Sequence, residues 1–175
     1  MIISVEKALD LIDIPDGWTD EKIGLKLRAI EQTIRAYTNN NFQDRDVRGA
    51  ADIIGGLFVM EALMPFNAGD TVQVSESRLN KGLFTVATAD DSTFTVEEAV
   101  KDESDVLVTK VAYPADVIDC CCNLMEWEIN NRDKVGIKSE TLSRHSVTYE
   151  DSASMFMGYP AAILGCLKPY RKARC

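Results

Sequence analysis

The sequence has no long apolar run and little positive charge. None of its hydrophobic stretches approaches the roughly 18 to 20 apolar residues of a membrane span. Glu6 and Lys7 fall where a signal peptide carries its apolar stretch, so we expect no secretion signal and no membrane association. The 175 residues include 28 acidic ones against 19 lysines and arginines, a formal charge of −9. This argues against a general nucleic-acid-binding protein, because neutralising phosphates requires surplus positive charge.

Sequence patterns that bind metal ions are also lacking. There is one histidine, and the five cysteines contain no Cys-x-x-Cys pair. Three cysteines at 120–122 are consecutive, so their side chains would point around a helix and could not all face one ion. We interpret the cysteines as small buried hydrophobic residues in a reducing compartment, and we predict no metal and no cofactor.

Catalytic motifs are missing as well. Ser143 and Ser146 flank His145, but neighbours in sequence do not make a catalytic triad, and there is no Gly-x-Ser-x-Gly motif. The glycines at 55–56 lack the following glycine and lysine of a phosphate-binding loop. Acidic pairs such as 90–91 fall at turns and fit a solvated surface better than a pair for acid/base catalysis. We therefore predict that the protein is not an enzyme.

Helical periodicity occupies the start of the chain. Ser4 is a good N-cap for a short helix that carries an apolar stripe as far as Ile12. A second helix should open at Thr19 or Asp20, because apolar residues then recur at spacings of three and four up to Tyr37. The asparagines at 39–41 suit its C-terminal end, since asparagine tolerates left-handed backbone conformations.

Helix returns in the second half of the chain. Pro114 suits a first helical turn, and the helix expected from there to about residue 130 has an apolar arc wider than one core face requires. Such a helix is either central to the fold or covered by another subunit. A short helix should begin at about Pro160 and end at Pro169.

The middle of the chain has strand periodicity. Valines and phenylalanines alternate with polar residues between positions 72 and 96, turn residues separate these runs, and a last strand is expected at 106–111. The pattern predicts an α+β protein: an α-helical bundle of three to four helices with an inserted small antiparallel β-barrel or sandwich. The helical core would comprise residues 1–50 and 114–175, and the inserted β domain residues 51–113.

Three features point to binding partners. These are the broad apolar helix, a polar stretch at 138–151 that is long for a linker, and a basic tail. Residues 152–175 contain four basic residues and no acidic one. Disorder would account for the tail, and a central position would account for the helix. A partner accounts for all three features together.

Several short motifs occur in a characteristic order. The first helix pair ends in YTNNNF at 37–42, and the third helix begins with YPADV at 113–117. They are followed by KSETLSRHSVTY at 138–149, YPAAIL at 159–164 and LKPYRKAR at 167–174. In this order the sequence resembles the head-to-tail connector (adaptor) proteins of long-tailed bacteriophages and related prophages. Residues 69–86 resemble a β module of a longer subset, because the minimal family pattern joins the second and third helices directly.

The resemblance implies a structural protein of the virion neck. Such proteins form a ring beneath the portal, usually of twelve copies, retain the packaged DNA and present a surface to a stopper or tail-completion protein. The implied partners are the portal, that next component and further copies of the chain. DNA would pass through without specific binding. The protein would lie at the head–tail junction of the virion, and in the host cytoplasm during assembly.

The resemblance also implies two sets of site residues. The candidates for portal docking lie in the C-terminal segment and are Leu167, Tyr170, Arg171, Lys172 and Arg174. The candidates for contacts in the loop or between subunits are Ser139, Glu140, Ser143, Ser146 and Tyr149. Two other functions remain open from the residues alone: a tail-completion or stopper protein whose barrel does the principal work, and a non-viral acidic binding module.

Overall fold

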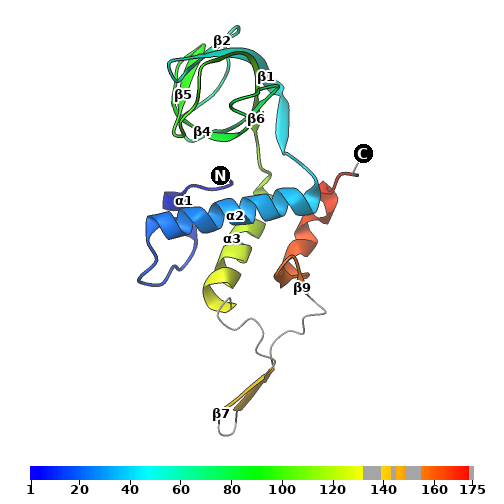
Figure 1. Ribbon diagram of the computed structural model, residues 1–175. Coiled ribbons are helices and arrows are strands. Elements are labelled where there is room, and N and C mark those ends of the chain that lie inside the picture. The colour runs from blue at the N-terminus through cyan, green and yellow to red at the C-terminus, as the bar shows by residue number, and fades with distance from the viewer. Residues whose placement is uncertain (132–138, 143–144, 149–154, 174–175) are drawn as a thin grey trace. The chain divides into compact units, whose positions relative to one another are not determined.

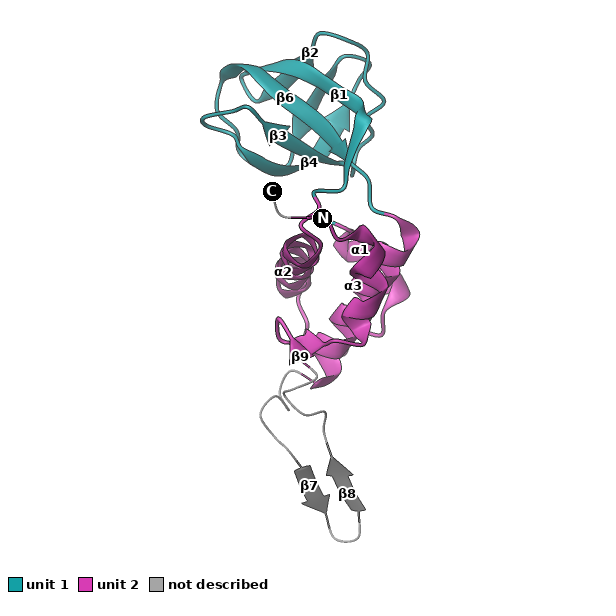
Figure 2. Cartoon of the chain, turned by 90° about the vertical axis from the view of Figure 1, so that its right-hand side faces the viewer, with its two compact units in different colours: residues 1, 41–113 teal, residues 2–40, 114–175 magenta. Residues whose placement is uncertain are grey.

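The computed structural model describes residues 1–131, 139–142, 145–148 and 155–173, which contribute to two compact units (Figure 1). Met1 and residues 41–113 form the first unit, and the second combines residues 2–40 with residues from 114 onward (Figure 2). The second unit is therefore built from both ends of the chain. The protein is of the α+β class, with a closed antiparallel barrel inserted between helices.

Six strands close the barrel in the order β1-β2-β5-β4-β3-β6, and every neighbouring pair is antiparallel. They are β1 (Gln43–Ile54), β2 (Leu57–Met60), β3 (Thr71–Ser75), β4 (Gly82–Ala89), β5 (Thr93–Val96) and β6 (Glu103–Val111). Gly55 and Gly56 join β1 to β2 with φ angles of 58° and 85°. Positive φ at both central residues is required by a type I′ turn, a common two-residue hairpin connection that glycine adopts without strain.

The barrel core follows from alternation along the strands. In β2, for example, Phe58 and Met60 are buried and Leu57 and Val59 are exposed. The buried side chains are mostly aliphatic, with three phenylalanines, and comprise Ala51, Ile53, Phe58, Met60, Phe66, Val72, Val74, Val86, Phe94, Val106 and Val108. The expected antiparallel β-barrel is therefore present, with an apolar interior of its own.

The barrel unit begins earlier than the sequence indicates. It starts at Asn41, and β1 at Gln43, whereas we expected the β domain to start at residue 51. The first half of β1 contains Asp44, Arg45, Asp46 and Arg48 and is partly exposed, so it carries no apolar alternation to mark it as a strand. Pairing with β6 through backbone hydrogen bonds holds this polar segment in the sheet.

The helical unit contains α1 (Val5–Leu11), α2 (Asp20–Thr38), α3 (Ala115–Asn131) and the 3₁₀ helix η3 (Ile163–Tyr170). The predicted caps are confirmed. The Ser4 side chain accepts a hydrogen bond from the Lys7 N–H, and the Thr19 side chain accepts one from the Lys22 N–H. Asn39 ends α2 with φ 48° and ψ 36°. Pro169 lies inside η3, one residue before its end, rather than after it, and proline donates no hydrogen bond to the helix because it has no N–H.

Helix α3 packs against both α2 and η3, which accounts for its wide apolar arc. Cys120 and Cys121 are fully buried on it, as expected. Burial raises the pKa of both thiols, so they stay protonated and are poor metal ligands. Cys122 is half-buried, whereas Cys166 is exposed and departs from the expectation of burial. Cys175 lies outside the described residues.

The polar stretch expected to be a loop contains a hairpin instead. Strands β7 (Ser139–Leu142) and β8 (His145–Thr148) pair antiparallel, and β9 (Met155–Phe156) pairs with β10 (Tyr159–Pro160). Serine and threonine disfavour helix, but threonine and valine fit strands well, so the composition excluded one element without excluding the other. In the described part of the chain no helix is both long and apolar enough to cross a membrane.

Candidate interaction surfaces

The C-terminal segment is fixed to the end of α2 by hydrogen bonds. The Lys172 N–H donates to the Thr38 carbonyl oxygen at 2.8 Å. The Asn39 side-chain amide donates to the Ala173 carbonyl at 3.0 Å, and the Asn40 amide to the Tyr170 carbonyl at 3.3 Å. Carbonyls in the last turn of a helix have no partner within the helix, so the segment satisfies one of them. Up to residue 173 the segment is therefore an ordered part of the helical unit.

Side chains of the same segment add further contacts. The Tyr170 hydroxyl donates to the Asp116 carboxylate in the first turn of α3 at 2.6 Å. This bond raises the pKa of Tyr170, because deprotonation would place a second negative charge beside the carboxylate. The Arg171 guanidinium lies 5.3 Å from the centre of the Tyr37 ring, a cation–π distance. The Tyr37 ring in turn meets Phe156 edge-on at 5.5 Å.

The five docking candidates are therefore in different environments. Leu167 is fully buried, so it is a core residue of the helical unit in this structure. Tyr170 is half-buried, and Arg171 and Lys172 are exposed. Lys168, which the resemblance did not single out, is exposed as well. Arg174 lies outside the described residues.

The loop candidates fall on the β7–β8 hairpin or beyond the described residues. Ser139 is the register partner of Thr148. Glu140 lies on the same strand, and Ser146 of β8 is the register partner of Thr141. Ser143 and Tyr149 are outside the described part of the chain. The structure thus brings three of the five loop candidates together on one hairpin.

A buried carboxylate joins α2, α3 and β10. The Glu128 side chain is 2% exposed, and it accepts hydrogen bonds from the Lys26 ammonium at 3.0 Å and from the Tyr159 hydroxyl at 2.7 Å. The Trp127 and Tyr159 rings also meet edge-on at 5.4 Å. A buried carboxylate with these partners is held in place by charge and hydrogen bonding, so we assign it a structural role. Periodicity places Glu128 on the buried face of α3 but does not reveal its partners.

Beside this network, α3 and η3 border an open groove of about 430 Å³. Asp119, Glu126 and Trp127 of α3 line it together with Ile163 and Cys166 of η3. Its two carboxylates make it acidic. No local pattern in the sequence indicates this groove, because residues from helices more than thirty positions apart form it.

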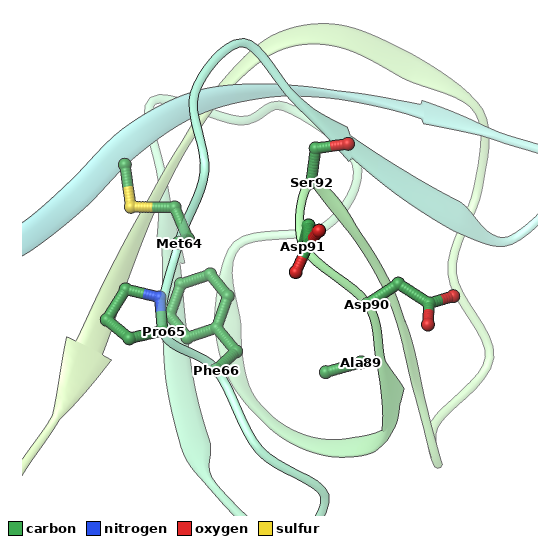
Figure 3. Close-up of a pocket in the computed structure, with 7 residues that line it drawn as sticks. All are labelled: Met64, Pro65, Phe66, Ala89, Asp90, Asp91 and Ser92. Atoms are coloured by element: carbon green, nitrogen blue, oxygen red, sulfur yellow. The ribbon is translucent and has the colours of Figure 1, made fainter.

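The barrel carries a second open groove, of about 490 Å³. Figure 3 shows Met64, Pro65 and Phe66 on one side and the Ala89–Ser92 turn on the other. The Met64 N–H donates to the Asp91 carbonyl at 3.0 Å, and the Phe66 ring packs edge-on against Phe94 at 5.1 Å. Among the described residues, no group of three or more histidine, cysteine or acidic side chains could hold a metal ion.

Comparison with protein-family models gives no match for this chain, and comparison with curated proteins gives none either.

Proposed function

We propose that the chain is a structural virion protein, a ring adaptor between the portal and the tail or stopper of a long-tailed phage. It retains the packaged DNA and enables tail attachment. One observation carries the proposal: the helical unit is assembled from the two ends of the chain, with the barrel between them. The motifs of the connector resemblance lie in the same two parts of the sequence. On this proposal the four helices form the connector's helical bundle.

The C-terminal segment supplies the portal-docking surface. Lys168, Arg171 and Lys172 are exposed, and no acidic residue occurs after Asp151. Hydrogen bonds to α2 hold the backbone of this segment, so its cations are presented from a fixed support. Fixed charges accelerate docking onto a surface of the opposite sign and orient it. The expected complement is an acidic surface of the portal.

Charge reversal tests this docking surface without removing structural contacts. We expect Lys168→Glu combined with Lys172→Glu to weaken binding to purified portal roughly tenfold or more, a change of about 1.4 kcal/mol. The matched control reverses two exposed barrel lysines, Lys81→Glu and Lys101→Glu, with the same change in net charge. Equal binding by both double variants would show that total charge, and not this surface, governs docking.

Electron microscopy tests the wider proposal. Tailless heads that carry the portal should acquire a collar when incubated with the protein. Heads without portal should not. An unchanged profile of portal-bearing heads at saturating protein would refute the adaptor function. A monomer in free solution is compatible with it, because the ring would then assemble on the portal.

A second candidate function is a stopper or tail-completion protein. The observation in its favour is that the barrel is a compact unit with its own core and an open groove. The order of addition separates the two functions. An adaptor adds to portal-bearing heads directly, whereas a stopper adds only after another neck protein is in place.

A further inference from the structure

Exposed apolar side chains lie on one outer face of the barrel, and the strand pairing shows which of them are neighbours. Ile54 and Leu57 are opposite each other across the β1–β2 hairpin, and Val59 lies two residues further along β2. Their exposed fractions are 62%, 37% and 37%. Thr95 and Thr93 of β5 are the partners of Leu57 and Val59, so uncharged side chains continue across the next strand. We call Ile54, Leu57 and Val59 with these two threonines the barrel face.

Carboxylates border the barrel face. Asp52 is the register partner of Val59 and accepts a hydrogen bond from the Asp105 N–H at 3.0 Å. Asp102 accepts one from the Gly55 N–H at the tip of the hairpin, at 2.7 Å. The residues Asp52, Asp102 and Asp105 are all exposed. An apolar centre with a charged rim is the usual anatomy of a protein interface, and the rim here is negative.

The exposed side of α2 has the complementary character. Leu25 is 61% exposed, with Lys22 one turn before it and Arg28 and Ala29 one turn after it. The Lys22 ammonium lies 3.8 Å from the centre of the Trp18 ring, which adds a half-buried aromatic side chain. We call these five residues the helix face. It combines an apolar centre with two cations. Glu21 is also exposed and one turn before Leu25, so the net charge on this side of α2 is +1.

We propose that the barrel face of one copy docks on the helix face of a second copy. This rests on the ring proposed above and names the surfaces that would build it. The two faces match in apolar character and are opposite in charge, which favours this pairing over others. Contact between two barrel faces would bring two acidic rims together. Each barrel unit is also acidic as a whole, with thirteen acidic and six basic residues at positions 41–113, so the two units would repel each other. Contact between different patches is heterologous, and a heterologous contact forms a ring when the rotation between successive copies closes on itself.

Intermolecular cross-linking tests the pairing. Cys122→Ser, Cys166→Ser and Cys175→Ser together provide a background without these three thiols. Leu57→Cys is introduced in one full-length chain and Leu25→Cys in another, and the two are mixed and treated with a short bismaleimide. Each chain has one new cysteine, so any product linking positions 57 and 25 joins two copies. The control replaces Leu57→Cys by Leu79→Cys, since Leu79 is 57% exposed but lies on the β3–β4 connection outside the barrel face.

The mixture should give the 57–25 product, both at high concentration in solution and on portal-bearing heads. The 79–25 mixture should give at most about a tenth as much. Lys22→Glu with Arg28→Glu in the Leu25→Cys chain should lower the yield by a similar factor, because it removes the charge complementarity. Leu9→Glu, on an exposed leucine of α1, is the control for an added acidic residue.

The outcomes separate the inference from the function on which it rests. Absence of the 57–25 product in both settings overturns the inference, as does a dominant 57–57 product, which would show barrel-to-barrel contact. A collar on portal-bearing heads without the 57–25 product leaves the adaptor function intact and refutes the pairing alone. The product without any collar supports the pairing and refutes the adaptor function.

Discussion

At the scale of single residues, Glu103 shows how a surface acid becomes structural. Its carboxylate accepts hydrogen bonds from the Ser77 hydroxyl at 2.6 Å, the Arg78 N–H at 2.7 Å and the Asn80 amide at 2.9 Å. These donors lie on the connection between β3 and β4, which therefore folds around one side chain of β6. The bonds, led by the one from Ser77, lower the pKa of Glu103 from 4.5 to about 2. From the sequence alone, acids in this region look like solvated surface charges.

The lowered pKa predicts a specific acid sensitivity. A carboxyl group whose pKa is lower in the folded state contributes stability above its unfolded value of 4.5, and that contribution is lost as the pH falls from about 4.5 to about 2. Glu103→Gln should therefore unfold at lower urea concentration than the parent at neutral pH. The difference should shrink below about pH 3. Barrel resonances in NMR spectra measure the unfolding midpoint, with exposed Glu61→Gln as the control. Parallel pH profiles of parent and Glu103→Gln would contradict the prediction.

At the scale of elements, one residue at the end of α2 has both a local and a long-range role. Asn39 adopts the left-handed conformation, which its short polar side chain tolerates, and the sequence predicted this helix end. The same side chain binds the Ala173 carbonyl, a contact that no local pattern contains. Asn39 therefore both ends α2 and holds the C-terminal segment.

Two substitutions at this position separate the two roles. Asn39→Ala loses the hydrogen bond and places an ordinary residue at positive φ, so it should lower the free energy of unfolding by about 2 kcal/mol. Asn39→Gly loses only the hydrogen bond, and its cost should be about 1 kcal/mol or less. Urea unfolding followed by tryptophan fluorescence measures both, since Trp18 and Trp127 both lie in the helical unit. Equal costs for the two substitutions would show that the backbone conformation contributes nothing.

At the scale of the whole molecule, the chain enters and leaves the barrel unit at neighbouring points. The Ala112 N–H donates to the Phe42 carbonyl at 2.9 Å, and the Phe42 and Tyr113 rings lie 5.1 Å apart. Insertions between close ends disturb a host unit little. The helical unit and the barrel should therefore fold independently.

Excision tests that independence. A chain with residues 41–113 replaced by a short glycine–serine linker should keep its helical circular dichroism and unfold in one cooperative transition. Residues 41–113 expressed alone should give the dispersed NMR spectrum of a folded barrel. Loss of cooperative unfolding in the shortened chain, with linkers of more than one length, would show that the helical unit depends on the barrel.

Local patterns predicted much of this fold. The caps at Ser4 and Thr19 and the helix end at Asn39 are correct because each depends on hydrogen bonds or backbone preferences within a few residues. Apolar alternation likewise indicated β3, β4 and β5. The first half of β1 and the β7–β8 hairpin were missed, because polar strands are held by pairing with distant or neighbouring strands rather than by an apolar face.

By itself, then, the sequence determined the elements with an apolar period, the insertion of a β unit between helical segments, and the acidic body with its basic end. The tertiary structure decided which charged groups belong to which surface. It fixed the C-terminal segment to α2, enclosed Glu128 with Lys26 and Tyr159, and assembled the barrel face from neighbouring strands. The physical reason is that periodicity records which side of an element is buried, whereas a surface depends on which elements become neighbours.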